Sequence, residues 1–512
     1  MEDYKRQTSG GYVQIPVSDR TVTDELSGDF TLPDYQPEIK RLLRITASVL
    51  PPSKYIGDNE AEFAGNVDYY VLYTGSDNEV YCAPLTTEYK IDVPVDQDSG
   101  LRLSNLTGSA EIVPDMISGR VTSPRKLNIK CRLKTRAQIF GDMTFDDSFS
   151  NQSDGENQVL HGEQTVSRAL FGSGEVLRLS DEIIIDNKEG EARVISADGK
   201  ALMSEVGCSA GLVNCRGDLY LKLLMGRENT GDTYTVTRKM PFSQSVVVDG
   251  VDSQSSASAQ AVVTEMNINV EDGRVCIDVG MIIDAAANKS EDVTYIKDVY
   301  STSHRTDCRY KTVTPRGIAN AFVGNFTLSD SMSLEEAGIS PECSVSDVTG
   351  TVFPEEISFE GGKCSVSGKA KFNMLLKRDG EYSCSDVELP FRYSTDTNMQ
   401  AENAGAMVSG EVISARARID GERIGIDSEI SMCGNMWHNC DIKLLDDVDF
   451  GEELKFSRGE YVVCYPSRDD TLWSVAKRYG ATISSLSQNN KISASDSPDS
   501  SDSLDGINYL II

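Results

Sequence analysis

The sequence predicts a mainly β protein, with three tandem antiparallel β-sandwich or barrel-like repeats followed by a small α+β domain of βααβ order. Two observations lead to this prediction. Three short patterns recur along most of the 512 residues with a period of about 150 residues, which indicates copies of one structural unit. The last fifty or so residues break that period and alternate between strand-like and helix-like patterns. We therefore expect four domains, at residues 1–158, 159–306, 307–458 and 459–512.

The recurring patterns follow one another in the same order in each copy. Several independent patterns on a single period are not expected from chance. The first pattern is Phe30–Asp34, Leu177–Asp181 and Phe326–Asp330, the second is Gly65–Tyr73, Gly217–Met225 and Gly368–Leu376, and the third is Lys126–Ile129, Arg274–Ile277 and Arg423–Ile426.

Each repeat is expected to be built from strands. Apolar and polar residues alternate along Gly65–Tyr73 and along Arg125–Lys134, which is typical of strands with one buried face. The Pro-Phe pairs at 241–242 and 390–391 suit a strand edge, where no amide is needed. One short helix is expected at Glu38–Ile45, where apolar residues have helical spacing. Polar stretches at 146–157 and 252–257 are expected to be loops.

The composition restricts the function. The formal net charge is −31, so we expect no nucleic-acid binding, because phosphate recognition needs a basic face. No run of 18 apolar residues occurs, so no membrane insertion is expected. The first ten residues lack the apolar centre of a secretion signal. The 12 cysteines contain no C-x-x-C pair, and we interpret them as reduced thiols in a cytoplasm.

The C-terminal segment shows a complete pattern of helix and strand signals. A short apolar strand, 460–464, is followed by a predicted helix with an apolar face at Leu472, Val475, Ala476 and Tyr479. Asp470 or Thr471 is expected to cap its first turn, and Gly480 to end it in a left-handed conformation. A second short helix from Thr482 to about Asn489 and a closing strand at 509–512 complete the segment.

The run Asp470–Gly480 in this setting resembles the LysM module. The resemblance implies a βααβ fold that binds N-acetylglucosamine-containing glycans or a protein partner. It also implies a groove between the loops 467–472 and 489–492. We assign Trp473 equally to this groove or to the small core of the module. The candidate partner-binding residues are Asp469, Asp470, Thr471, Leu472, Trp473, Asn489, Asn490, Lys491 and Ile492.

Three departures from the LysM pattern favour a protein partner over a neutral sugar. Asp469 replaces the usual glycine, Asp505-Gly506-Ile507 replaces the usual closing Pro-Gly-Gln, and the polar stretch 493–503 lengthens the second loop. Added aspartates suit a basic protein surface better than an uncharged glycan.

The N-terminal repeat carries a second resemblance. The tract Gly28–Pro37, followed by the glycine-initiated strand at 65–73 and, in the later copies, by a Pro-Phe strand, resembles the SPOCS domain of endospore-forming bacteria. Together with a terminal LysM module it resembles the spore-coat morphogenetic proteins of the SipL type. The resemblance implies a non-enzymatic scaffold without cofactor in the mother-cell cytoplasm. The implied partner is the ATP-hydrolysing protein of the coat's basement layer or another coat protein, with peptidoglycan glycan chains as a further candidate.

Other functions have weaker support in the sequence. Cys433, His438 and Cys440 lie close together, but they lack the spacing and the fourth ligand of a zinc site. Three isolated histidines and no nucleophile motif argue against an enzyme. The runner-up hypothesis is a cell-wall-associated peptidoglycan-binding protein, and a wall hydrolase would need a carboxylate pair in a cleft. Our main hypothesis is three β-domains that form a rod or platform for a LysM adaptor.

Overall fold

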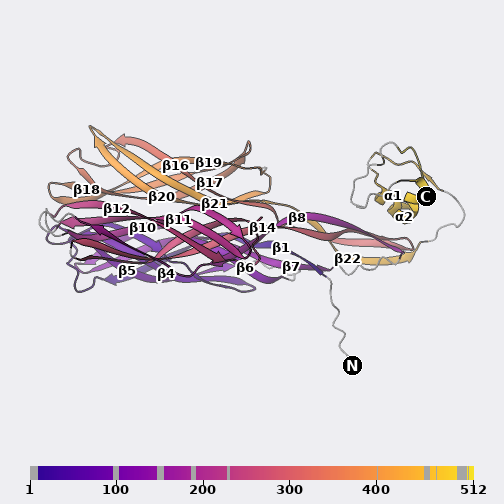
Figure 1. Cartoon of the computed structure of the whole chain (residues 1–512), viewed down its shortest axis with the longest axis horizontal. Coiled ribbons are helices and arrows are strands. Elements are labelled where there is room, and N and C mark those ends of the chain that lie inside the picture. The colour runs from indigo at the N-terminus through magenta and orange to yellow at the C-terminus, as the bar shows by residue number, and fades with distance from the viewer. Residues whose placement is uncertain are drawn as a thin grey trace, which may run out of the picture.

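A computed structural model of the chain describes residues 10–95, 103–146, 155–185, 192–227, 231–271, 273–399, 402–454, 462–468, 470–492, 504 and 507–512. Antiparallel strands make up the three repeats, and the two short helices lie in the C-terminal module (Figure 1). The predicted fold class is therefore confirmed.

Each repeat is a sandwich of two antiparallel sheets. In the first repeat, the order β1-β7-β6 faces a sheet in which β4 pairs with β2, β3 and β5. The strands are β1 Gly10–Thr31, β2 Arg41–Val49, β3 Ser53–Ile56, β4 Glu60–Thr74, β5 Val80–Pro94, β6 Leu103–Ser123 and β7 Lys126–Asp146.

The second repeat has the same two sheets. The order β10-β11-β12 faces a sheet in which the long strand β14 pairs with β13, β8 and β9. The strands are β8 Asn157–Ser173, β9 Leu177–Ile184, β10 Ala192–Ser209, β11 Leu212–Arg227, β12 Thr233–Val247, β13 Ser256–Glu271 and β14 Arg274–Ser301.

The third repeat combines β17-β18-β19 with β16-β21-β20, and a two-stranded ribbon, β15-β22, extends from it. β8 and β15 begin slightly ahead of the expected domain boundaries, which remain predictions. The strands are β15 His304–Val313, β16 Arg316–Ser333, β17 Ser344–Glu360, β18 Lys363–Arg378, β19 Glu381–Asp396, β20 Ala404–Asp420, β21 Arg423–Asn439 and β22 Ile442–Glu453.

The three copies share irregularities as well as strands. The strands β2, β10 and β17 occupy the same place in the three copies. Each has a β-bulge at the same register, at Leu43, Ile195 or Ser346. Another bulge recurs at Asp115, Thr264 and Ile413. Bulges bend strands and re-aim side chains. Their threefold recurrence shows that the second and third sequence patterns mark equivalent strands, each in a separate sheet.

The first pattern needs a correction in the N-terminal copy. In the later copies, Leu179 lies opposite Val279 and Leu328 lies opposite Ser428. The equivalent position in the first copy is Leu26, opposite Cys131. Asp24–Gly28 is therefore the true counterpart, and Phe30–Asp34 lies six residues further along the chain. The two segments are both short, apolar-polar stretches, so the sequence comparison selected the wrong one.

The expected helix at Glu38–Ile45 is wrong, because residues from Arg41 onward form β2. The bulge at Leu43 explains the misleading pattern, since it interrupts the alternation of the strand. Leu42 consequently packs on the core of the first repeat, whereas Leu43 packs on a cluster shared with the other repeats. The loop expected at 252–257 lies between β12 and β13 and ends at Ser256. Most of the loop expected at 146–157 lies outside the described residues.

A glycine and an aromatic ring form a repeated pair on the central hairpins. Gly65 lies opposite Tyr89, Gly217 opposite Phe242 and Gly368 opposite Phe391. The ring covers the glycine in each case, so that a Cβ atom at Gly368 would lie 3.0 Å from Phe391 and 2.1 Å from a backbone carbonyl. Glycine is therefore required by close approach of its neighbours.

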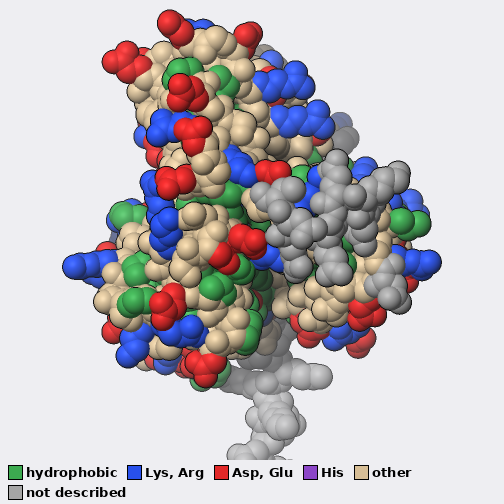
Figure 2. Space-filling model, turned by 90° about the vertical axis from the view of Figure 1, so that its left-hand side faces the viewer, with side chains coloured by type: hydrophobic (Ala, Val, Ile, Leu, Met, Phe, Trp, Pro, Cys, Tyr) green, Lys and Arg blue, Asp and Glu red, His purple; other side chains and the backbone are tan. Residues whose placement is uncertain are grey.

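The three sandwiches lie side by side around a common axis. Figure 2, which looks along the long axis of the molecule, shows three lobes around a central junction. Equivalent leucines of the three copies, Leu72, Leu224 and Leu375, meet in one apolar cluster at this junction. A second shared cluster contains Val13, Val166 and Val313, each from a different repeat. The repeats therefore form a closed ring and not the linear rod that was one of our expectations.

A buried carboxylate connects all three repeats. Asp347 of the third repeat has a side chain only 2% exposed. It accepts hydrogen bonds from Arg44 of the first repeat at 3.0 Å and from Lys222 of the second at 2.8 Å. Arg44 also donates to Thr349, and Lys222 donates to the carbonyl of Val348. These two cations hold the pKa of Asp347 below its usual range against the opposing effect of burial.

Gly368→Ala tests the glycine–aromatic pair. The added methyl group collides with the Phe353 carbonyl and with Phe391, so we expect a loss of about 1–3 kcal/mol in unfolding free energy, measured by chemical denaturation. Gly425→Ala is the matched control, because Gly425 also lies in a strand of the third repeat but has open space around its Cβ position. Equal stability of the two variants would contradict the packing argument.

Candidate functional site

The C-terminal module has the expected βααβ order. β23 Val463–Cys464 pairs antiparallel with β24 Leu510–Ile511, and between them lie α1 Leu472–Tyr479 and α2 Ile483–Asn490. Thr471, one of the two expected caps, caps α1 and forms a capping box with Ser474. Gly480 ends the helix in the left-handed region, at φ 63°. The local sequence signals thus lead directly to the observed structure.

The other expected cap, Asp470, braces the first groove loop. Its carboxylate accepts a hydrogen bond from Arg478 at 2.5 Å and one from the backbone amide of Ser467 at 2.9 Å. These bonds lower the pKa of Asp470. The side chain is buried and already paired, so its role here is to shape the loop. Asp469 lies outside the described residues.

The second groove loop contains two exposed candidates and two structural ones. Asn489 and Lys491 are exposed, and Lys491 ends α2 at φ 54°. Asn490 instead bridges α2 and β24, since its side chain bonds both the amide and the carbonyl of Ile511. Ile492 packs partly on the apolar core of the module.

That core is centred on α1 and α2. Val475, Ala476, Leu486 and Leu510 are fully buried, whereas Leu472, which we expected to be buried, is only partly covered. The core also includes Tyr300, a residue of β14 in the second repeat. The module is therefore not packed on itself alone.

Trp473 packs partly on the core of the module, which is one of its two expected places, and it also contacts the second repeat. Its indole ring packs edge-on against Tyr300, with ring centroids 4.8 Å apart, and its Nε1 donates to Asp298 at 2.9 Å. Trp473 thus joins the module to the second repeat. The contact lies on the arm, a name used here for the ends of β8 and β14 and the β15-β22 ribbon, which project beyond the body toward the module (Figure 1).

Asp298 is the centre of this docking contact. Its carboxylate also accepts from Lys477 at 2.6 and 2.7 Å and from the Tyr310 hydroxyl at 2.7 Å. A bulge immediately before it interrupts the pairing of β14 with β8, which re-aims the side chain. These hydrogen bonds hold the pKa of Asp298 below its usual value although burial opposes them.

Two further hydrogen bonds complete the docking contact. The Tyr300 hydroxyl donates to the carbonyl of Ala481 at 2.8 Å, and the Ile483 amide donates to the side chain of Gln158 at 3.4 Å. Sequence reasoning missed Asp298, Tyr300 and Gln158. Aromatic and acidic residues are close together near the end of β14, and this run was the one available signal in the sequence. The run did not indicate which residues of the C-terminal module it contacts.

Comparison with family models gives two matches. Residues 192–271 match the SipL, SPOCS domain, and residues 467–499 match the LysM domain. This is the SipL-type architecture. No curated protein matches the chain, and no solved structure matches it either.

The SPOCS match covers β10 to β13 of the second repeat, although the sequence resemblance was read from the first. The first and third repeats have the same sheets and bulges as the second, so all three repeats have the same fold. Both matched domains are binding domains, and LysM domains in general bind peptidoglycan or other N-acetylglucosamine glycans.

The structure adds three observations on chemistry and location. None of the helices in the described residues is long and apolar enough to cross a bilayer. Among those residues, no group of three or more His, Cys, Asp or Glu side chains is placed to hold a metal ion. The 12 cysteines are all described and all unpaired; Cys433, for example, contacts the Ser409 hydroxyl.

Asp298→Asn is expected to loosen the LysM domain from the arm. The change removes the charge that Lys477 and Trp473 share, and a hydrogen bond to a charged group contributes about 1.5–3 kcal/mol. Hydrogen exchange followed by mass spectrometry should show faster exchange in peptides covering 296–301 and 471–483. Asp447→Asn, which removes an exposed carboxylate paired with Arg309 on the same arm, should leave both peptides unchanged. Identical exchange in the two variants would contradict the docking role.

Proposed function

We propose that this protein is a non-enzymatic scaffold of spore-coat assembly that acts in the mother-cell cytoplasm at the forespore surface. The observation that carries the proposal is the combination of a SPOCS domain with a C-terminal LysM domain, which connects the chain with sporulation. The ring of repeats would be the platform, and the LysM domain would link it to the ATP-hydrolysing protein of the coat's basement layer or to another coat protein.

The docking of the LysM domain supports a protein partner. Trp473 packs against Tyr300 of the second repeat, and Asp470 is paired with Arg478. Among the described groove candidates, Asn489 and Lys491 remain exposed. An exposed amide and an exposed cation suit a polar protein surface. The basic partner surface expected from the sequence rests on Asp469 and Asp505, which lie outside the described residues.

Peptidoglycan binding is the second candidate function, because LysM domains in general bind such glycans. In that case the protein would act at the cell wall. The two candidates differ in what the LysM domain recognises, so binding to each target can be measured separately.

The test compares the full chain with groove variants and a truncation. Asn489→Ala combined with Lys491→Ala should weaken capture of the basement-layer ATPase about tenfold, measured by pull-down or interferometry, because both changed side chains are exposed on the proposed contact. Deletion of 460–512 should abolish this capture and leave sedimentation with purified peptidoglycan little changed. Gln488→Ala, an exposed neighbour on α2, is the matched control.

The opposite pattern would overturn the proposal. If the truncation abolishes binding to purified cortex or wall glycan and leaves the coat partner bound, the LysM domain is a glycan-binding module, and the cell-wall candidate replaces the scaffold.

A further inference from the structure

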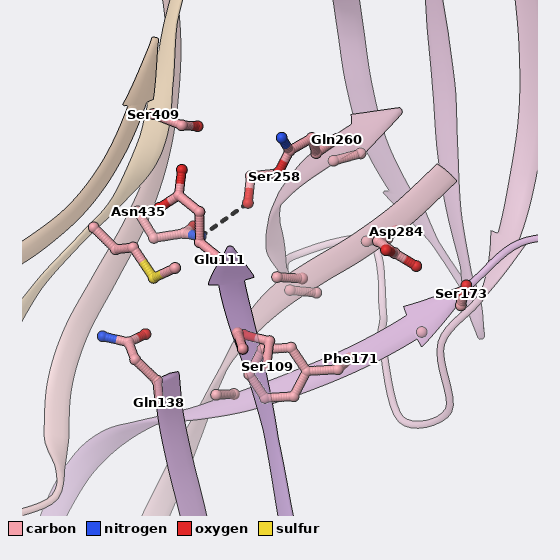
Figure 3. A pocket seen from close by; sticks show the side chains of 18 of the residues that line it. Ser109, Glu111, Gln138, Phe171, Ser173, Ser258, Gln260, Asp284, Ser409 and Asn435 are labelled. Atoms are coloured by element: carbon pink, nitrogen blue, oxygen red, sulfur yellow. Dashed lines mark hydrogen bonds between the residues drawn. The ribbon is translucent and has the colours of Figure 1, made fainter. Parts of the chain in front are cut away.

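A cavity of about 250 Å³ lies where the three repeats meet. Residues at equivalent positions of the three copies line it: Ser109 and Ser258, for example, occupy the same register in β6 and β13. Figure 3 shows polar side chains from all three repeats around the space, with Asn435 hydrogen-bonded to Ser258. A polar cavity at the centre of the ring is not required by the packing of sandwiches, each of which has its own apolar core.

Arg316 is a buried cation in the wall of this cavity. The residue is 5% exposed, and its guanidinium lies between the rings of Trp437, at 4.0 Å, and Phe140, at 4.5 Å. Among the described residues, no hydrogen bond or ion pair satisfies this guanidinium, and its Nε atom is buried without a partner. A buried charge normally has a partner, because desolvation is costly.

The neighbouring charges do not supply that partner. Asp19 acts on Arg316 from a distance, but its carboxylate already accepts from Arg136 and from the side chain of Gln138. Arg136 also lies over the Trp437 ring, 5.8 Å from its centroid, and adds a second positive charge. Two guanidinium groups thus share one carboxylate, and one buried positive charge is left over.

The two acidic residues that line the cavity are otherwise occupied. Asp284 interacts with the ammonium group of Lys54. Burial raises the pKa of Glu111 to about 7, so that its carboxyl group is partly protonated at neutral pH and can donate as well as accept hydrogen bonds. Neither residue is among the charges that act on Arg316.

We propose that this cavity binds a small organic molecule through a carboxylate or phosphate group held by Arg316. A guanidinium presents two parallel N–H donors that match such an oxyanion, and the stacking on Trp437 and Phe140 fixes its plane. Gln138, Asn435 and the serine hydroxyls would bind the polar remainder of the ligand. The walls of the cavity come from all three repeats. The ligand would therefore bind only the closed ring of repeats and stabilise that ring.

The chain provides a reporter for this site. It contains two tryptophans, Trp437, which stacks on Arg316, and Trp473 on the LysM domain. In a Trp473→Phe protein, all tryptophan emission comes from the residue that stacks on Arg316. Sodium phosphate, acetate, L-malate and L-glutamate are titrated at constant ionic strength, with chloride as the reference, while emission and melting temperature are followed.

We expect a saturable change in emission and a rise in melting temperature with at least one probe, and the phosphate and carboxylate arms show which group is preferred. Arg316→Gln should weaken binding at least tenfold, as should Arg316→Lys, which keeps the charge but loses the planar pair of donors. Arg309→Gln, on an exposed pair of the arm, should bind as the parent does.

Absence of a saturable response to every probe, or the same response in Arg316→Gln and the parent, would overturn the proposal. If Arg316→Gln fails to fold, the comparison of Arg316→Lys with Arg309→Gln decides the question. The Trp437 emission comes from the third repeat, and Trp473→Phe is common to every protein compared, so this proposal and the scaffold function can fail independently.

Discussion

The arrangement of the repeats depends on the carboxylate of Asp347, which holds Arg44 of the first repeat and Lys222 of the second. A buried ion pair adds little net stability compared with apolar residues of the same size, but removing one partner leaves an uncompensated charge. The main effect of this contact is therefore to specify which repeats lie next to each other. Equivalent leucines from all three copies surround the same junction, and these leucines do not distinguish one copy from another.

Asymmetry at equivalent positions sets the order of the repeats. The residue that follows the bulge is Arg44 in the first copy, Ser196 in the second and Asp347 in the third. Only the third can pair with two cations. Three copies of one fold thus become three distinct members of a ring, which can carry one arm and one terminal module. The arm belongs to the second and third repeats, and Asp298 on it binds the LysM domain through Trp473 and Lys477.

Local patterns in the sequence predicted the strands, the repeat period and the C-terminal βααβ module. They succeeded where a residue's neighbours along the chain decide its structure, as at the capping box of Thr471 and the left-handed Gly480. They failed where a bulge breaks the alternation, as at Leu43, which made a strand look helical. In the first copy, Phe30–Asp34 was matched to the later copies although the true counterpart lies six residues earlier. Equivalent positions are defined by the residues they pair with on the next strand, and a single sequence does not show that pairing.

The long-range contacts could not be predicted from one sequence. Asp298 and Trp473 are 175 residues apart, and Arg44 and Asp347 are 303 apart. Neither pair belongs to a motif, and the residues differ between copies, so the repeat pattern does not reveal them. Trp473 illustrates the consequence: it packs partly on the module core, as one expectation had it, but its contacts with Asp298 and Tyr300 lie outside the module.

A double-mutant cycle between Arg44 and Asp347 tests ring closure most directly, because these residues belong to the first and last repeats. Unfolding free energies are measured for the parent, Arg44→Met, Asp347→Asn and the double variant. A closed ring predicts that the losses are not additive, with a coupling energy of about 1–3 kcal/mol. Strictly additive losses would mean that the two side chains do not meet, and would contradict the ring.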